Sequence, residues 1–154
     1  MFRRRKQRAL VIARGQGEVL IRAGIGSQFR VDACGSWPHT LPIHSYDVAL
    51  VQLCVPPLRN ECGDSDQRED DAVMQEMLRQ VEHSLLIIAR IRALNPACAI
   101  LAITHSDLIG DAKRALEAGA DWHQSIDWTN SPPSFLLGQI AHALKRRQEL
   151  SAVS

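Results

Sequence analysis

The sequence predicts a single α/β domain, a doubly wound (βα)5 three-layer sandwich with a parallel sheet in strand order 2-1-3-4-5. Two observations lead to this fold class. Short continuous apolar runs, such as 48–51 and 99–103, are typical of parallel strands that are covered on both faces. Such runs alternate five times with segments of helical periodicity, and right-handed crossovers then give the stated strand order.

The composition agrees with one globular domain and argues against several other classes of protein. The chain has 154 residues, of which 45% are hydrophobic and 23% charged, and its formal net charge is +1. No apolar stretch approaches the roughly 18 residues of a membrane span, and the run 9–13 is too short for a signal peptide. We therefore expect one cytoplasmic domain over 1–154, with its core at about 8–147, a basic tail over 1–7 and a polar loop over about 57–70.

The N-terminal half contains three apolar or alternating runs that are expected to be strands: 8–13, 29–33 and 46–55. A helix over 18–25 is expected to stop at Gly26. Pro38 and Pro42 make any helix within 36–45 short or irregular.

The C-terminal half begins with a long amphipathic helix, expected over about 71–94. Its apolar positions recur at steps of three and four residues: Val73, Met77, Val81, Leu85, Ile88, Ile91 and Leu94. Four further elements are expected: a strand at 99–104, a helix at 107–118 capped by Ser106, a short strand at 121–125, and a helix capped by Ser131 that runs to about Leu150.

Three segments, in their order along the chain, carry a resemblance to a known family. Residues 46–56 form a strand followed by proline, Thr104 closes the fourth strand, and residues 115–121 read Ala-Leu-Glu-Ala-Gly-Ala-Asp. Together they resemble the receiver domain of bacterial two-component response regulators, whose fold is flavodoxin-like. The resemblance implies a Mg²⁺ held by two acids after the first strand, a phosphoacceptor aspartate ending the third, and a lysine after the fifth.

Matched by position, this sequence lacks nearly all of that chemistry. The corresponding pocket positions carry Ala13, Arg14, Gln52, Thr104 and Ile126. Arg14 stands at an acidic position and would repel Mg²⁺, which takes oxygen ligands. Gln52 stands at the phosphoacceptor, and an amide is not an anionic nucleophile. Only Thr104 keeps the family's residue type, so we expect a pseudo-receiver with no catalytic residue, no metal and no cofactor.

The resemblance also implies a mode of action through protein partners. Receivers usually dimerise through the fourth helix, fifth strand and fifth helix, which makes Arg114, Trp122 and Lys145 interface candidates. His123 takes the place of the family's switch aromatic. Packing in the core is the alternative explanation for Trp122. We expect a regulatory domain that controls transcription or another output, without direct contact to nucleic acid or membrane.

Two alternatives remain open for the altered pocket. Arg14, Gln52, Cys54, Thr104 and His105 are expected to meet at the carboxyl ends of the central strands. Such a pocket could sense a small anion or an acidic side chain, or Arg14 could close it by pairing with a local acid such as Asp107. A single-domain protein and the N-terminal regulatory domain of a transcription activator both fit the sequence.

Overall fold

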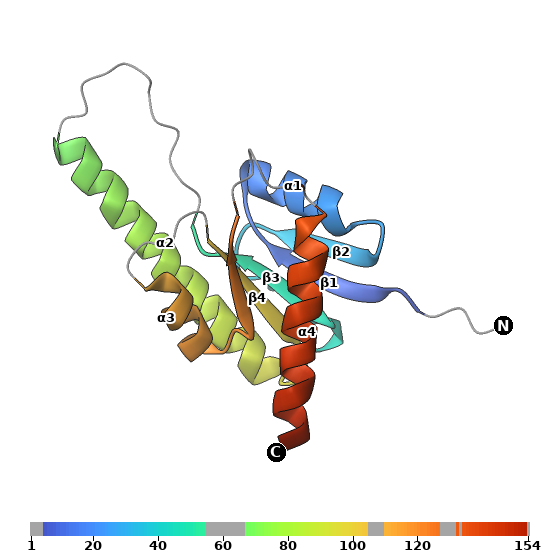
Figure 1. The fold of residues 1–154 in the computed structure, drawn as a ribbon. Helices are drawn as coiled ribbons and strands as arrows, with labels where there is room; N and C mark the ends of the chain where they lie inside the picture. The colour runs from blue at the N-terminus through green and yellow to red at the C-terminus, as the bar shows by residue number, and fades with distance from the viewer. Residues whose placement is uncertain (1–4, 55–66, 105–109, 127–131, 133, 154) are drawn as a thin grey trace.

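A five-stranded parallel sheet in the order β2-β1-β3-β4-β5 forms the centre of the molecule in the computed structural model (Figure 1). The structure describes residues 5–54, 67–104, 110–126, 132 and 134–153. The strands are β1 (Gln7–Ile12), β2 (Phe29–Cys34), β3 (Val48–Gln52), β4 (Ala99–Thr104) and β5 (Trp122–Ser125). The predicted fold class and strand order are confirmed.

Two helical layers cover the sheet, each over its own apolar cluster. Helices α1 (Gly15–Ile25) and α4 (Phe135–Val153) cover one face, where Ile21 and Ile140 pack against Val11 and Leu101. Helices α2 (Gln67–Leu94) and α3 (Asp111–Ala118) cover the other face (Figure 1). The central strands are buried from both sides, as their continuous apolar sequence predicts.

The connection from β2 to β3 contains only a short 3₁₀ turn, η1 (Ile43–Ser45). Proline at 38 and 42 cannot donate the backbone hydrogen bonds that a longer helix needs. Instead Trp37, Leu41 and Ile43 pack over the sheet. The buried amide of Asn95 fixes this connection, because Nδ2 donates to the carbonyls of Ile43 at 3.0 Å and Tyr46 at 2.9 Å.

Helix α2 begins four residues earlier than the sequence pattern indicates, at Gln67 rather than Asp71. Its predicted apolar positions divide into three groups: Val81, Ile88 and Ile91 are buried, Met77 and Leu85 are half-buried, and Val73 and Leu94 are exposed. Val73 and Leu94 thus share the apolar spacing of the helix without sharing the burial of its central positions.

The two remaining helices also differ from their expected bounds. Helix α3 is described from Asp111, and Ser106, its expected cap, lies outside the described residues, as does Ser131. Helix α4 starts at Phe135 and runs three residues past Leu150. Over the described residues, none of the helices combines the length and apolarity needed to cross a membrane.

Candidate functional site

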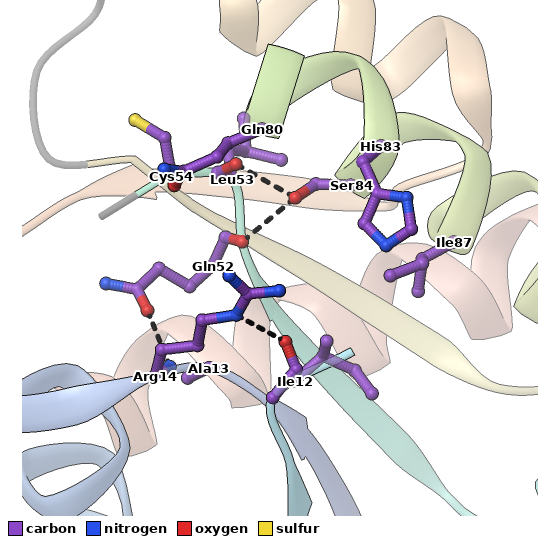
Figure 2. A pocket seen from close by; sticks show the side chains of 11 residues that line it. Ile12, Ala13, Arg14, Gln52, Leu53, Cys54, Gln80, His83, Ser84 and Ile87 are labelled. Carbon is purple, nitrogen blue, oxygen red and sulfur yellow. Dashed lines mark hydrogen bonds between the residues drawn. The ribbon is translucent and has the colours of Figure 1, made fainter. Parts of the chain in front are cut away.

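A small cavity lies at the carboxyl edge of the sheet, between the ends of β1, β2 and β3 and the middle of α2 (Figure 2). Its volume is about 40 Å³, room for a few waters or one small ion. The lining side chains that bear polar groups are Arg14, Gln52, Cys54, Gln80, His83 and Ser84. The cavity therefore forms where a doubly wound fold commonly binds its ligands.

Gln52 ends β3, and its side-chain amide turns toward the start of α1. Its Oε1 accepts a hydrogen bond from the backbone N–H of Arg14 at 3.1 Å (Figure 2). A Cβ at Gly17 would come within 2.7 Å of Gln52 Nε2, so the absent side chain at position 17 makes room for this amide. Gln52 thus acts as a neutral acceptor that fixes the turn between β1 and α1.

Arg14 is the residue before α1 and supplies a permanent positive charge at the cavity. Its Nε donates to the carbonyl of Gly35 at 2.8 Å, which ties the end of β1 to the end of β2. The two described hydrogen bonds of Arg14 are made with Gly35 and Gln52, and Asp107, its expected partner, lies outside the described residues. Among the described residues there is no cluster of three side chains suited to a metal ion.

Helix α2 contributes polar groups that the sequence pattern did not reveal. Ser84 is buried, and its Oγ is within hydrogen-bond distance of the carbonyls of Leu53 at 2.8 Å and Gln52 at 3.2 Å. His83 lines the same cavity from the exposed side of the helix. The sequence feature that could have predicted this contact is a serine that lies between the buried positions Val81 and Ile88 of the helix.

Cys54 lies in the cavity wall as a buried thiol. Burial raises its pKa above the ordinary value, and the charge of Asp111 acts in the same direction. A raised pKa keeps the sulfur in its unreactive protonated form at neutral pH. Both the burial and the raised pKa of Cys54 argue against a nucleophilic role.

Two of the predicted pocket positions, Thr104 and Ile126, do not line this cavity. Thr104 and Ile126 are both buried, and the backbone N–H of Ile126 donates to the carbonyl of Thr104 at 2.9 Å. The Ile126 side chain belongs to the cluster beneath α1 and α4. Ala13 is buried in that cluster and also touches the cavity, whereas His105 lies outside the described residues. Of the predicted pocket residues that the structure describes, Ala13, Arg14, Gln52 and Cys54 line the cavity together.

The interface candidates lie in different surroundings. Trp122 packs against α4, where its Nε1 donates to Gln139 Oε1 at 3.1 Å and its ring lies 4.3 Å from that of His142. His123 stacks on Trp122 at 5.4 Å. Arg114 forms an ion pair with Glu82 of α2, and Lys145 is exposed on α4.

Comparison with solved structures places this fold among receiver domains. An orphan response regulator of H. pylori, HP1043, has a TM-score of 0.59 at 17% identity and covers 90% of this chain and 96% of its own. A CheY-like receiver domain protein from Methanospirillum hungatei has a TM-score of 0.61 at 14% identity, over 93% and 97% of the two chains. A response regulator from Thermotoga maritima has a TM-score of 0.61 at 12% identity, over 91% and 98%.

These likenesses show that the chain has the flavodoxin-like receiver fold. No family model matches the chain, and no curated protein matches it.

Proposed function

We propose that this chain is a pseudo-receiver, a non-enzymatic signalling domain that works without phosphorylation and regulates an output in a bacterial pathway through protein contacts. The receiver fold supports the signalling role. The single observation that carries the proposal is the hydrogen bond between Gln52 Oε1 and the backbone N–H of Arg14, at the strand end where the resemblance puts the phosphoacceptor.

The chemistry of this site opposes phosphoryl transfer in two ways. The amide of Gln52 has no anionic oxygen to attack phosphorus. Arg14 places a positive charge where two carboxylates would hold Mg²⁺, and a like charge repels the ion. The domain therefore needs another way to populate its working state, either its own sequence or a partner.

A phosphorylation assay tests the proposal directly. The protein is incubated with acetyl phosphate and Mg²⁺, and its intact mass is measured. We expect no added phosphoryl group. A matched control, Ala13→Asp/Arg14→Asp/Gln52→Asp, supplies the three missing carboxylates and checks that the assay can detect transfer. A phosphoryl group on the unmodified chain would overturn the proposal.

The proposed partner contact is a homodimer through α3, β5 and α4. Lys145 is exposed on this face and His123 is half-buried beside Trp122. The indole of Trp122 already contacts Gln139 and His142, so only the part of the ring that is exposed to solvent can contact a partner. Sedimentation of the wild type and of Trp122→Ala at pH 7.5 tests the contact, because a variant that dimerises equally well excludes it.

A second candidate function is the sensing of a small anion. The observation that favours it is the cavity lining: the Arg14 guanidinium, the Gln52 amide and the His83 imidazole are present, and no carboxylate lines the cavity in the described part of the chain. Calorimetry with inorganic phosphate, on the wild type and on Arg14→Gln, tests it. Heat that saturates in the wild type and disappears in the variant would support anion sensing, and equal traces would exclude it.

A further inference from the structure

A second cavity, larger than the first, lies at the amino edge of the sheet, whereas the candidate functional site lies at the carboxyl edge. Its volume is about 310 Å³, at the lower end for pockets that hold a ligand. Two chain segments form its wall. Residues 5–8 lead from the N-terminus into β1 (Figure 1), and Ser45 and Asp47 precede β3.

Along this cavity β1 has no strand beside it. β1 pairs with β2 from Gln7 onward, but β3 begins only opposite Ala9. Asp47 bonds to the backbone of Arg8, because its Oδ2 accepts from the Arg8 N–H at 2.8 Å and its own N–H donates to the Arg8 carbonyl at 2.9 Å. The backbone groups of an extended chain alternate in side, so those of Lys6 point the same way as those of Arg8 and face the cavity. A bound peptide can therefore hydrogen-bond to β1 here as an added strand.

The positive charge of this cavity exceeds its negative charge. Within the described residues, Arg5 has no hydrogen bond or ion pair, and the Lys6 ammonium contacts one backbone carbonyl at 3.3 Å. The third cation, Arg8, is already paired with Asp32 at 3.3 Å. The one carboxylate in the described lining is Asp47. Arg5 and Lys6, both exposed, thus remain available to an acidic partner.

These groups fit an acidic peptide better than a nucleic acid. The N–H groups of a peptide can donate to the Lys6 carbonyl and to the Asp47 carboxylate, whereas a sugar-phosphate chain has no such donor and is repelled by Asp47. The described lining also has no aromatic ring on which a base could stack. The occupant favoured by the cavity is therefore an extended peptide with acidic side chains.

We propose that the amino edge of this domain binds an acidic peptide segment of a partner protein. The peptide lies along residues 5–7 as a short added strand, and its carboxylates pair with Arg5 and Lys6. This contact goes beyond the proposed function and does not require that phosphorylation be lost. Phosphorylation and peptide binding are measured separately, so failure of one is distinguishable from failure of the other.

Two peptide titrations measure this binding. The fluorescence anisotropy of labelled hexaglutamate should rise and saturate as the protein is added at low salt. Hexaglutamine, which has the same length without the charge, should bind at least about tenfold more weakly. Added salt should weaken the binding of hexaglutamate, because exposed charge pairs are screened. A wild type that leaves the anisotropy unchanged, or that binds both peptides equally, would overturn the proposal.

Charge changes test where the peptide binds. Arg5→Glu/Lys6→Glu should raise the dissociation constant for hexaglutamate at least about tenfold. The matched control, Arg79→Glu/Lys113→Glu, makes the same change in net charge at two exposed positions of α2 and α3 and should raise it less than about twofold. Circular dichroism should show both variants folded. Equal losses in the two would show that the net charge of the domain, and not this edge, binds the peptide.

A change of opposite sign is expected at Asp47. Asp47→Asn removes the negative charge from the cavity, while its amide oxygen can still accept from the backbone N–H of Arg8. This variant should therefore bind hexaglutamate more tightly than the wild type. Unchanged or weaker binding would contradict the position given to the peptide carboxylates.

Two substitutions of Lys6 separate the backbone contribution from the charge. Lys6→Ala and Lys6→Pro both remove the ammonium, but proline also removes the N–H that an added strand would use. Lys6→Pro should therefore bind hexaglutamate more weakly than Lys6→Ala, and equal binding would exclude the added strand. A single-stranded DNA oligonucleotide of the same length is the last probe. Tighter binding of this DNA than of hexaglutamate would assign the edge to nucleic acid and overturn the proposal.

Discussion

Arg92 of α2 donates from Nη2 to Oδ2 of Asp121 across 2.7 Å, and the exposed fraction of that carboxylate is only 2%. The same carboxylate accepts from the backbone N–H of Ile100 at 2.9 Å and lies 3.5 Å from Arg147 of α4. One acid thus joins both helical layers to the start of β4. Burial lowers the pKa of Arg92, and the nearby Asp121 charge opposes this effect.

Removing this acid should destabilise the domain strongly. Asp121→Ala leaves Arg92 and Arg147 without their shared counter-charge, and breaking a buried pair in this way costs about 3–5 kcal/mol. Urea denaturation followed by circular dichroism measures the loss. Exchanging the exposed acid Glu117, by Glu117→Ala, is the control and should change the free energy of unfolding by less than about 0.5 kcal/mol. Similar losses in both variants would contradict the central position given to Asp121.

The glycine beside this pair should resist substitution. Gly119 has φ +126°, and a Cβ there would lie 3.0 Å from Cβ of Arg92. We expect Gly119→Ala to cost about 1–3 kcal/mol, because both backbone strain and crowding oppose it. Gly138, in α4, has nothing within 4 Å of its Cβ position, and Gly138→Ala should stabilise by about 0.5–1 kcal/mol. Thermal unfolding of the two variants should therefore shift in opposite directions.

Charges introduced along α2 should have graded effects. Ile88→Asp should unfold the domain, because this position is fully buried and an unpaired carboxylate there costs several kcal/mol, comparable with the whole stability. Met77→Asp should cost less, since Met77 is half-buried. Glu76→Lys, at an exposed position, should change stability by less than about 0.5 kcal/mol. Equal effects at all three positions would show that the assigned helical phase is wrong.

Acid should weaken the contact between β2 and the β3 connection. Tyr46 Oη donates to Asp32 Oδ2 at 2.7 Å, and this bond, with Arg8, lowers the pKa of Asp32. In the unfolded chain the pKa of Asp32 is about 3.9, and in the folded protein it is lower. The ionised carboxylate therefore stabilises the fold at pH values above 3.9, and this stabilisation is lost as the pH falls through the folded-state pKa. At pH 7 the midpoint temperature of thermal unfolding should be higher for the wild type than for Asp32→Asn. The difference between the two midpoints should shrink as the pH is lowered. A gap independent of pH would exclude this cause.

Restoring an acid at position 52 alone should not restore phosphorylation. Gln52→Asp supplies a carboxylate, but Ala13 and Arg14 still provide no metal ligand. Intact mass after incubation with acetyl phosphate and Mg²⁺ should stay unchanged. A phosphorylated single variant would show that the Arg14 charge is no barrier.

The sequence predicted the sheet well, because a strand that is buried on both faces has a continuous apolar run, which segments with polar residues do not have. Residues 99–104 illustrate this, since the expected strand and β4 coincide. The limits of α2 were harder to predict, because a helical pattern does not reveal where the sheet beneath it ends. Val73 and Leu94 continue the apolar pattern yet lie exposed.

The candidate site was predictable only where strand ends determine it. Arg14 follows β1 and Gln52 ends the neighbouring parallel strand β3, so their proximity could be inferred from the chain order. His83 and Ser84 reach the cavity because α2 crosses the sheet at a particular rotation and height, which local sequence does not encode. Thr104 and Ile126 were grouped with the pocket by position alone, and their side chains are buried elsewhere.

The short connection between β2 and β3 limits how this domain can change in length. Residues 35–47 must lead from the end of the edge strand β2 back to the start of the central strand β3 and pass over β1, a path of about 20–30 Å given strand spacings near 4.8 Å. Fully extended, such a segment reaches about 45 Å, so it holds moderate slack. The extra length forms the turn whose carbonyls accept hydrogen bonds from Asn95. If a few residues before Pro42 were deleted, the connection would still be long enough to join β2 to β3. If the hydrogen bonds at Ile43 and Tyr46 were lost, the connection would detach from Asn95 and expose one side of the core.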